Sequence, residues 1–439
     1  MSTHPVPEIR LATRSDLPHL INALQQLVTT GGVRRPGPGD DVDGLSPALI
    51  VEPATTVEAS QVLKFAHHDH LAVIPRGAGT KLNWGNVPRR FDLILSTARL
   101  NRVLEHAAGD LIARVEAGTP VERLQDLVAG AGQTLPLDPP QLGATVGGII
   151  AANASGPHRI RYGTARDLLI GVTYILPDGT IARAGGKVVK NVAGYDLCKL
   201  FTGSLGSLVL LAEVIVRLHP LPATSRTILL SNLPGHTGLG ASVQAVLHSA
   251  LVPSAIDFVW QRNGGIMMVR FEGVEPGVIA QTEAARTLLQ PYGAARVLEG
   301  RAELDLWDST AAMSRERVPG STRLKVSALP ADLPQILSRA EVLIHQNNLE
   351  WRIMGHAGSG IAYLDLHGTD QSMIGIIREL RQYISVRGGS VVAQSAPLSV
   401  KREIDVWGDP AGDAALQKAI KDRFDPRGIL SPGRPMGRL

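Results

Sequence analysis

A glycine-rich turn directly follows a short apolar segment near the start of the chain. The apolar segment LAVIP occupies residues 71–75, and the turn PRGAGTKLNWG occupies residues 75–85. Gly77 and Gly79 permit close approach of the backbone to a ligand, so consecutive amides could bind a pyrophosphate. The spacing matches neither the ATP-binding G-x-x-x-x-G-K-[ST] pattern nor the dinucleotide-binding G-x-G-x-x-G pattern. Taken alone, an ordinary tight turn explains the segment equally well.

A second segment of small residues, GATVGGIIAANASG at 143–156, also predicts close backbone contact. With so few large side chains, the backbone itself can lie directly against a neighbour. That neighbour is either a flat or anionic ligand or a closely packed helix. On its own, the segment favours the packed helix.

The composition excludes several kinds of function. Lys and Arg number 44, Asp and Glu 40, and aromatic residues make up 4% of the chain, so the sequence offers no basic, aromatic-rich surface for nucleic acid. Cys198 is the only cysteine. The chain alone therefore forms no disulfide, four-cysteine zinc site or iron–sulfur cluster. Neither a signal peptide nor a membrane span is indicated, so we expect a cytoplasmic protein. Peripheral attachment to the inner face of the cytoplasmic membrane through partners stays open.

Capping boxes predict the start of two helices in the first half of the chain. The first follows Thr55, with Glu58 three residues later. The second follows Thr119, with Pro120 at the first helical position and Glu122 completing the box. Both helices alternate with short apolar segments that predict strands, so the architecture is mixed α+β.

The order of predicted elements changes near Pro220 and Pro222, where the longest apolar strand ends. Beyond this point the predicted order is strand, helix, strand, strand, helix near 226–293. The same order recurs, with one further strand, near 321–396. Each half has the pattern of a split βαβ unit, so we predict one antiparallel sheet built from two ferredoxin-like halves.

Four segments recur here in an order and spacing found in one known family. They are Arg76-Gly77-x-Gly79-Thr80, Thr145-Val146-Gly147-Gly148 with Asn153, Tyr162-Gly163-Thr164, and Gly194-Tyr195-Asp196-Leu197 with Gly203-Ser204-x-Gly206. Together they resemble the PCMH-type FAD-binding domain of the vanillyl-alcohol oxidase superfamily. The implied fold is a two-part FAD-binding domain at 43–222 followed by an α+β cap domain at 223–400. We place an N-terminal helix and linker at 1–42 and a C-terminal segment that returns to the FAD domain at 401–439.

The resemblance also implies how FAD would be held. The glycine-rich turn would wrap the pyrophosphate, and the stretch from Thr145 to Asn153 would approach the pyrophosphate and the isoalloxazine. Some members attach flavin through a histidine in the first loop, but this chain has none between His70 and His106, so we expect non-covalent FAD. The implied FAD-binding residues are Arg76, Gly77, Ala78, Gly79, Thr80, Lys81, Ala144, Thr145, Val146, Gly147, Gly148, Asn153, Gly163 and Gly206.

The whole chain is similar to FAD-binding subunits of bacterial glycolate oxidase complexes. The segments that carry this similarity are GGKVVKNVAGYDL at 185–197, MGHAGSGIAYL at 354–364 and DVWG at 405–408. Related D-2-hydroxy-acid dehydrogenases bind a metal through Gly-His-x-Gly-Asp-Gly-Asn-x-His and a later Glu-His. Of those ligands only His356 is present here, because Ser359, Ile361, Tyr363 and Gln394-Ser395 replace the others. One imidazole cannot hold a divalent metal tightly, so we expect none.

These resemblances imply a flavoprotein subunit that oxidises a short 2-hydroxy acid, glycolate or D-lactate, to the 2-oxo acid. Electrons would pass through the flavin to a second flavoprotein subunit and an iron–sulfur subunit of the same complex. His356 is the candidate catalytic base, although the sequence favours a structural role for it. Two alternatives are an autonomous FAD-dependent 2-hydroxy-acid dehydrogenase and a non-catalytic flavin-binding assembly subunit.

Overall fold

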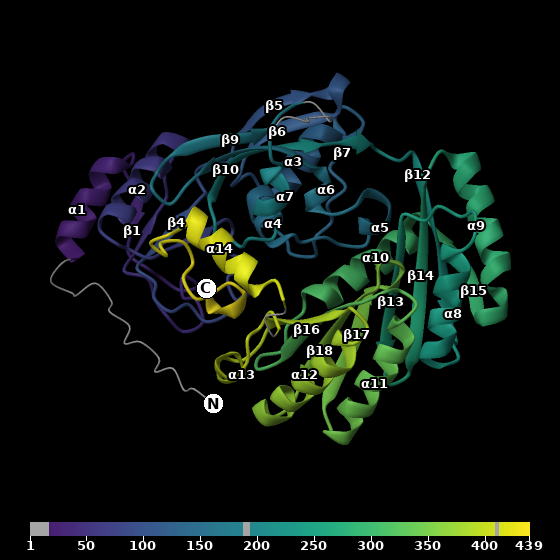
Figure 1. Ribbon diagram of the computed structural model, residues 1–439. Helices are drawn as coiled ribbons and strands as arrows, with labels where there is room; N and C mark the ends of the chain where they lie inside the picture. Colours follow the sequence, from purple (N-terminus) through teal and green to yellow (C-terminus); the bar gives the residue numbers. More distant parts are fainter. Residues whose placement is uncertain (1–16, 188–193, 409–411) are drawn as a thin grey trace.

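Two domains lie side by side in the computed structural model, which describes residues 17–187, 194–408 and 412–439 (Figure 1). In Figure 1 the first domain is coloured purple to teal and the second is largely green. The predicted motif at 185–197 is only partly covered, because residues 188–193 lie outside the described residues.

A four-stranded sheet forms the first part of the first domain. Its elements are α1 (Leu17–Leu27), β1 (Val33–Arg34), β2 (Leu49–Val51), α2 (Thr56–His68), β3 (Val73–Arg76) and β4 (Leu93–Ser96). The strand order is β1-β2-β4-β3, and β2, β4 and β3 run parallel. All residues of β2 and β4 are buried, as expected for a parallel sheet covered on both faces. Thr55 caps α2 by accepting a hydrogen bond from the Glu58 amide, which confirms the predicted cap, but the Glu58 carboxylate accepts from the Ala54 amide and not from Thr55, so the box itself is incomplete.

A five-stranded antiparallel sheet, in the order β5-β6-β10-β8-β9, forms the second part. Ile175, Leu210 and Ala212 from this sheet enter the hydrophobic cluster of the first sheet, so the two parts share a core. The strands are β5 (Val103–Ala107), β6 (Ile112–Glu116), β8 (Leu169–Ile175), β9 (Ile181–Gly185) and β10 (Leu210–Arg217), with β7 (Gln133–Thr134) paired to β11 (His219–Pro220). The helices are η1 (Ala108–Asp110), α3 (Val121–Ala129), α4 (Val146–Ala152), α5 (Arg159–Tyr162), α6 (Ala165–Leu168) and α7 (Leu197–Phe201).

The second capping prediction is wrong. Pro120, not Thr119, occupies the position before α3, and no side chain caps this helix. The Thr119 hydroxyl is turned inward and donates to the Arg102 carbonyl at 3.3 Å. Glu122 accepts a hydrogen bond from the Gly143 amide, so both side chains of the predicted box have other partners.

One eight-stranded sheet forms the cap, in the order β15-β12-β14-β13-β17-β18-β16-β19. In each half the first strand lies between the fourth and the third, which confirms the ferredoxin-like halves. Pairing of β13 with β17 joins the halves. The strands are β12 (Thr224–Ser231), β13 (Ala255–Gln261), β14 (Gly264–Gly273), β15 (Ala294–Glu299), β16 (Thr322–Ser327), β17 (Glu350–His356), β18 (Ile361–His367) and β19 (Ser390–Ser395). The helices are α8 (Gly235–Leu247), α9 (Glu275–Leu289), η2 (Gln290–Tyr292), α10 (Gly300–Arg315), α11 (Leu333–Gln346), η3 (Ala357–Ser359) and α12 (Asp370–Ser385).

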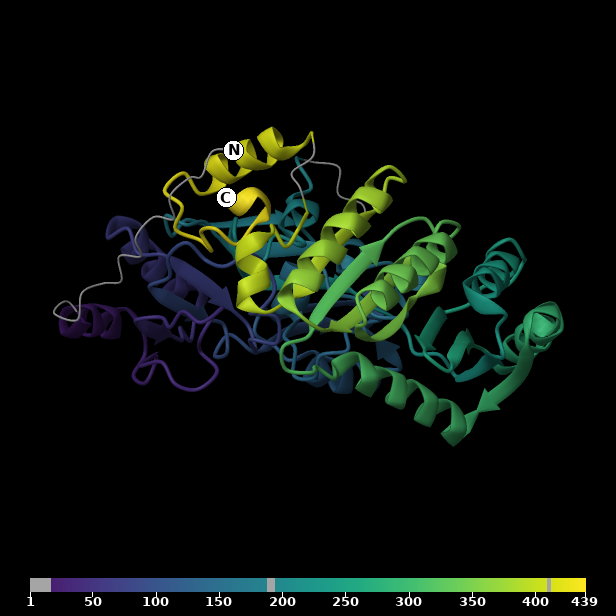
Figure 2. The same cartoon turned by 90° about the horizontal axis from the view of Figure 1, so that it is seen from below.

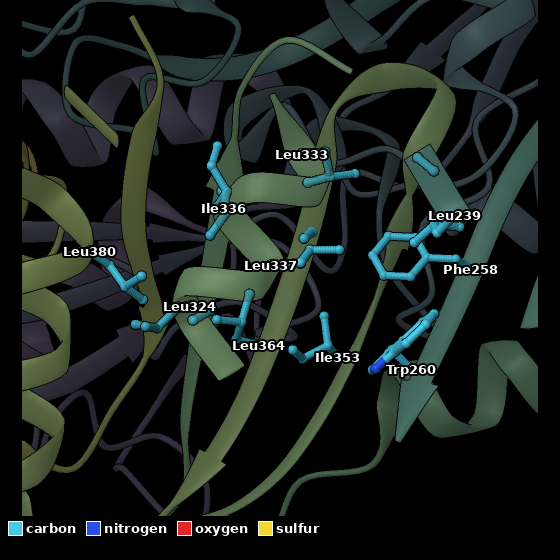
Figure 3. Close-up of a cluster of buried hydrophobic side chains, with 14 of the residues drawn as sticks. Leu239, Phe258, Trp260, Leu324, Leu333, Ile336, Leu337, Ile353, Leu364 and Leu380 are labelled. Carbon is cyan, nitrogen blue, oxygen red and sulfur yellow. The ribbon is translucent and has the colours of Figure 1, made fainter. Parts of the chain in front are cut away.

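The main core of the cap lies between this sheet and the layer of α8, α9, α11 and α12. Figure 3 shows Ile336 and Leu337 of α11 packed over Leu364 of β18. Helix α10 belongs to a separate cluster in which Trp307 packs with Met354 and Tyr363. The opposite sheet face is therefore left for α10 and the first domain.

The C-terminal segment lies against the first domain, as Figure 2 shows in yellow. It contains α13 (Leu398–Glu403), α14 (Ala414–Phe424) and η4 (Met436–Arg438). The Val73 amide donates to the Ile429 carbonyl at 2.8 Å, and the Ser431 amide donates to the Val73 carbonyl at 2.9 Å. The segment thus extends the edge of β3, immediately before the glycine-rich turn.

Candidate active site between the two domains

The glycine-rich turn at the end of β3 lines a cavity of about 100 Å³. The start of α4 contributes Thr145, Gly147 and Gly148, and the turn after α7 contributes Ser204, Leu205 and Gly206. The sequence segments 75–85, 143–156 and 203–206 therefore meet around one space, although more than a hundred residues separate the first from the last.

Small residues are required where these segments touch. A Cβ atom on Gly77 would overlap the Thr145 hydroxyl oxygen, and one on Gly147 would lie 2.6 Å from the Ala117 Cβ. Thr145 in turn caps α4 by accepting a hydrogen bond from the Gly148 amide at 3.2 Å. The glycines thus bring the turn and the helix start into direct contact, which leaves backbone amides at the cavity.

Two basic side chains of the turn have different surroundings. Arg76 forms a 2.5 Å ion pair with Asp40, and hydrogen bonds from Arg34 and Arg76 hold the pKa of the Asp40 carboxyl well below its usual range. Burial lowers the pKa of Lys81 to about 8. Across the described ranges no carboxylate lies within ion-pair distance of Lys81, whose ammonium sits 3.3 Å from the Thr80 hydroxyl. A nearly buried amine without a counter-ion suits an anionic ligand.

The structure brings most, but not all, of the predicted FAD-binding residues to this cavity. Arg76, Gly77, Ala78, Gly79, Thr80, Lys81, Thr145, Gly147, Gly148 and Gly206 line it. The remaining residues lie elsewhere: Ala144 and Val146 are buried in the hydrophobic core, Asn153 lines the neighbouring cavity, and Gly163 ends α5. The sequence reasoning missed Thr97, Ala117 and Arg434, which also line the cavity. Arg434 belongs to the C-terminal segment, and only its place in a Pro/Gly-rich turn hinted at it.

Three cavities, each sharing lining residues with the next, lie between the glycine-rich turn of the first domain and the cap sheet, and we refer to this set as the trough. A middle cavity shares Ala152 with the cavity at the glycine-rich turn. It shares Pro140, Ser155, Ser314 and Tyr363 with a larger chamber of about 280 Å³ under the cap sheet. A ligand as long as a dinucleotide at one end could therefore reach side chains of the cap at the other.

Polar side chains of the cap strands surround the middle cavity. Lys325 on β16, Tyr363 on β18 and Gln394 on β19 line it. Burial lowers the pKa of Lys325 to about 8, and the nearby Arg159 guanidinium acts in the same direction. From the first domain, Asn153 presents a buried amide oxygen that has no hydrogen-bond partner among the described residues. Lys325, Tyr363 and Gln394 can donate hydrogen bonds to a small anion, whereas the Asn153 oxygen can only accept one from a donor.

Arg323, the other basic group of the middle cavity, is tied to the cap. It forms a bidentate ion pair with Asp365 across the β16–β18 ladder, with both N–O distances at 2.5 Å. Lys325 is thus the basic side chain here that lacks an ion pair in the described part of the chain.

His356 ends β17 and lines the larger chamber. Its Nδ1 lies 3.0 and 3.1 Å from the two carboxylate oxygens of Asp257 on β13. The Tyr363 ring meets the imidazole edge-on at 5.7 Å. The pKa of Asp257 is raised, because burial outweighs the opposing effect of the adjacent His356. One ring nitrogen of His356 is therefore engaged by Asp257, and the catalytic role of His356 stays a prediction.

A second imidazole, His158, links the two domains at the chamber. Its Nδ1 lies 2.7 Å from Asp138 of the first domain, and its Nε2 lies 3.0 Å from Glu272 of the cap. Burial lowers the pKa of His158, but the two carboxylates outweigh this effect and raise it to about 10. The ring is consequently an imidazolium at neutral pH, so it cannot act as a base.

The donor set fits FAD better than it fits a metal ion. Backbone amides and the Lys81 ammonium at the glycine-rich end suit a pyrophosphate, and the trough continues toward the chamber. Among the residues that the structure describes, no group of three or more His, Cys, Asp or Glu side chains is placed to hold a metal ion. The expectation of a metal-free site stays a prediction.

Comparisons with known proteins assign both domains of the chain to known families. Residues 47–185 match the family described as FAD binding domain, and residues 241–434 match the C-terminal domain of FAD linked oxidases. The chain is 26% identical over 418 residues to the glycolate oxidase subunit GlcD of Bacillus subtilis, covering 88% of each chain. It is 28% identical to a D-lactate dehydrogenase of Archaeoglobus fulgidus, covering 89% of this chain and 92% of the relative.

Two further similarities bear on activity and fold. A D-2-hydroxyglutarate dehydrogenase of Xanthomonas citri pv. viticola is 27% identical over 424 residues, covering 89% of each chain. The structure of p-cresol methylhydroxylase with substrate bound superposes with a TM-score of 0.77, at 14% identity, covering 96% of this chain and 97% of that one. The superposition confirms the PCMH-type fold.

Proposed function

The chain belongs to the FAD-linked oxidoreductases, since it carries both their FAD binding domain and their C-terminal domain, and from this premise we propose that it oxidises a 2-hydroxy acid to the 2-oxo acid. The observation that carries the proposal is the trough, which joins the glycine-rich turn to Lys325 and His356. Three relatives named for glycolate, D-lactate and D-2-hydroxyglutarate support this class of substrate.

FAD, when bound, supplies the acceptor for the hydride that leaves C2 of the acid. The turn from Arg76 to Lys81 and the start of α4 would hold its pyrophosphate without a covalent bond. Lys325 would bind the substrate carboxylate, because it is a partly buried cation without a carboxylate partner in the described ranges. His356 would accept the hydroxyl proton as hydride leaves.

The first experiment tests both cofactor and substrate. The purified protein should be yellow and should release FAD on denaturation. Anaerobic mixing with glycolate or D-lactate should bleach the flavin absorbance. A colourless protein that fails to take up added FAD would overturn the cofactor assignment, and a flavin that neither acid reduces would overturn the assigned reaction.

We further propose that the flavin is reoxidised within a complex that holds a second flavoprotein subunit and an iron–sulfur subunit. The similarity to the GlcD subunit supports a complex, and Cys198 is the only thiol that this chain could offer to a cluster. Purification of a tagged chain from its native cell should recover companion proteins and iron. A lone, iron-free protein that turns over fully would instead favour an autonomous dehydrogenase, as the relatives named D-lactate and D-2-hydroxyglutarate dehydrogenase suggest.

The location of the protein follows the same proposal. Throughout the described ranges, no helix combines the length and apolar character needed to cross a membrane. We propose a cytoplasmic protein that reaches the membrane only through partners. Fractionation of native cells tests this, and retention of the tagged chain in the membrane after its partners are deleted would contradict it.

A further inference from the structure

Asp257 and His356 meet because the two halves of the cap sheet are joined at β13 and β17. In that antiparallel pairing Phe258 stands opposite Gly355, so Asp257 and His356, the next residues on the two strands, face each other directly across the ladder. The two side chains are only 5% and 11% exposed. A buried carboxylate beside a buried imidazole is stable only when the two are hydrogen-bonded.

We propose that Asp257 is a positioning residue that holds His356 with its proton on Nδ1, which leaves Nε2 to accept the substrate's hydroxyl proton. This inference rests on the function proposed above. The nearly equal distances of 3.0 and 3.1 Å support it, because one N–H can be shared between two carboxylate oxygens. A protonated carboxyl would instead donate through one oxygen only.

The Asp257–His356 pair provides a nitrogen that accepts the proton and a carboxylate that stabilises the charge that results. The C2–H bond breaks with its electron pair, which leaves as hydride to the bound flavin, the oxidant of the reaction. The O–H bond breaks as its proton moves to Nε2, and the C2–O bond becomes a carbonyl. The imidazolium that results carries a positive charge beside the Asp257 carboxylate, which stabilises it. Tyr363 packs edge-on against the ring at 5.7 Å and limits its rotation.

The test uses Asp257→Asn in the FAD-loaded protein. Asparagine has the same shape but presents an NH₂ group, which donates to Nδ1 and moves the ring proton to Nε2. Nitrogen-15 NMR of labelled histidines should show Nδ1 protonated in the wild type and Nε2 protonated in the variant, with His356→Gln assigning the signal among the 13 histidines. The rate of anaerobic flavin reduction by glycolate or D-lactate should fall by about 100-fold or more. Affinity for oxalate, which cannot be oxidised in this way, should change by less than about 3-fold.

Two controls separate positioning from general damage. Asp305→Asn removes the same charge from an exposed residue of α10 that lines none of the three cavities, and it should leave the His356 tautomer and the reduction rate unchanged. In the His356→Gln background, Asp257→Asn should cause no further loss, because Asp257 acts through that ring.

The inference and the proposed function can fail separately. An Asp257→Asn protein that keeps the wild-type tautomer, or that is reduced at the wild-type rate, overturns the positioning role. A wild-type flavin that neither acid reduces overturns the proposed function instead, while the tautomer measurement still decides whether Asp257 sets the state of the ring.

Discussion

Two Lys–Asp pairs begin on helix α14, one of them ending at its C-cap residue Asp425, and their different burial predicts very different effects of substitution. Lys418–Asp422 and Lys421–Asp425 have the same spacing along the helix and the same 2.6 Å N–O distance. The side chains of the first pair are 61% and 59% exposed, whereas those of the second are 8% and 0% exposed. We expect Lys421→Met to be far more destabilising than Lys418→Met.

The loss of unfolding free energy depends on which hydrogen-bond partners each substitution leaves unpaired. Lys421 also donates to the carbonyls of Ser207 and Leu430 at 2.7 and 2.8 Å, so its loss leaves three buried acceptors without this donor. Breaking a buried ion pair costs about 3–5 kcal/mol. Asp425 keeps hydrogen bonds from the amides of Ile429 and Leu430, so we expect the lower end, about 3 kcal/mol. The exposed pair should contribute about 0.3–0.5 kcal/mol.

Urea denaturation of the FAD-loaded protein measures this difference, with the rise of flavin fluorescence reporting loss of the first domain. Lys421→Met should lower the midpoint strongly and weaken FAD binding, because Ser207 directly follows Gly206 at the cavity. Lys418→Met should change neither. Equal midpoint shifts for the two variants, or a loss below about 1 kcal/mol for Lys421→Met, would refute the argument that burial decides the strength of the pair.

Three further predictions concern the site. Gly77→Ala should weaken FAD binding about 5-fold or more. The reason is that the new Cβ would displace Thr145 from the start of α4, at a cost of about 1 kcal/mol. Flavin titration of the apoprotein measures the affinity, and an unchanged value would contradict this prediction. The raised pKa of His158 stabilises the fold fully below pH 6.5, and this stabilisation should disappear as the pH rises through about 10. The denaturation midpoint should therefore fall over this pH range in the wild type but not in His158→Gln. The same pH dependence of the midpoint in both proteins would contradict this prediction. Elemental analysis should find no stoichiometric metal, and a metal lost on His356→Ala would mean that another ligand set has formed.

Local sequence predicted those features that depend on neighbours in the chain. The Thr55 cap of α2 needs only residues three positions apart, and the repeated order of strands and helices predicted the ferredoxin-like halves. The prediction of a Thr119 cap failed because contacts with residues distant in the chain decide where the Thr119 side chain points. Thr119 is buried and donates to Arg102, so its hydroxyl cannot reach the helix start.

The site itself could be predicted only in part. A resemblance assigns whole segments, but successive residues of a helix point in directions about 100° apart, so Val146 enters the core while Gly147 lines the cavity. Arg76 was expected from its charge, yet its ion pair with Asp40 joins positions far apart in the chain. Asp257 and His356 are 99 residues apart, and no local pattern marks the carboxylate as the partner of the ring.

The residues of the middle cavity suit a substrate carboxylate better than the metal ion that related D-2-hydroxy-acid dehydrogenases bind. Tyr363 and Gln394 replace ligands at that pattern's positions, and both line the same cavity as Lys325. A divalent cation placed there would be close to the Lys325 ammonium and would find no anionic side chain at either replaced position, so repulsion would not be offset. A carboxylate placed there would instead gain a partly buried ammonium whose pKa burial has lowered to about 8. Binding of that anion should favour the charged amine, because the carboxylate returns part of the solvation that burial removed. We therefore propose that Lys325 gives the chain another way to hold the acid end of a 2-hydroxy acid, while His356, positioned by Asp257, accepts the proton.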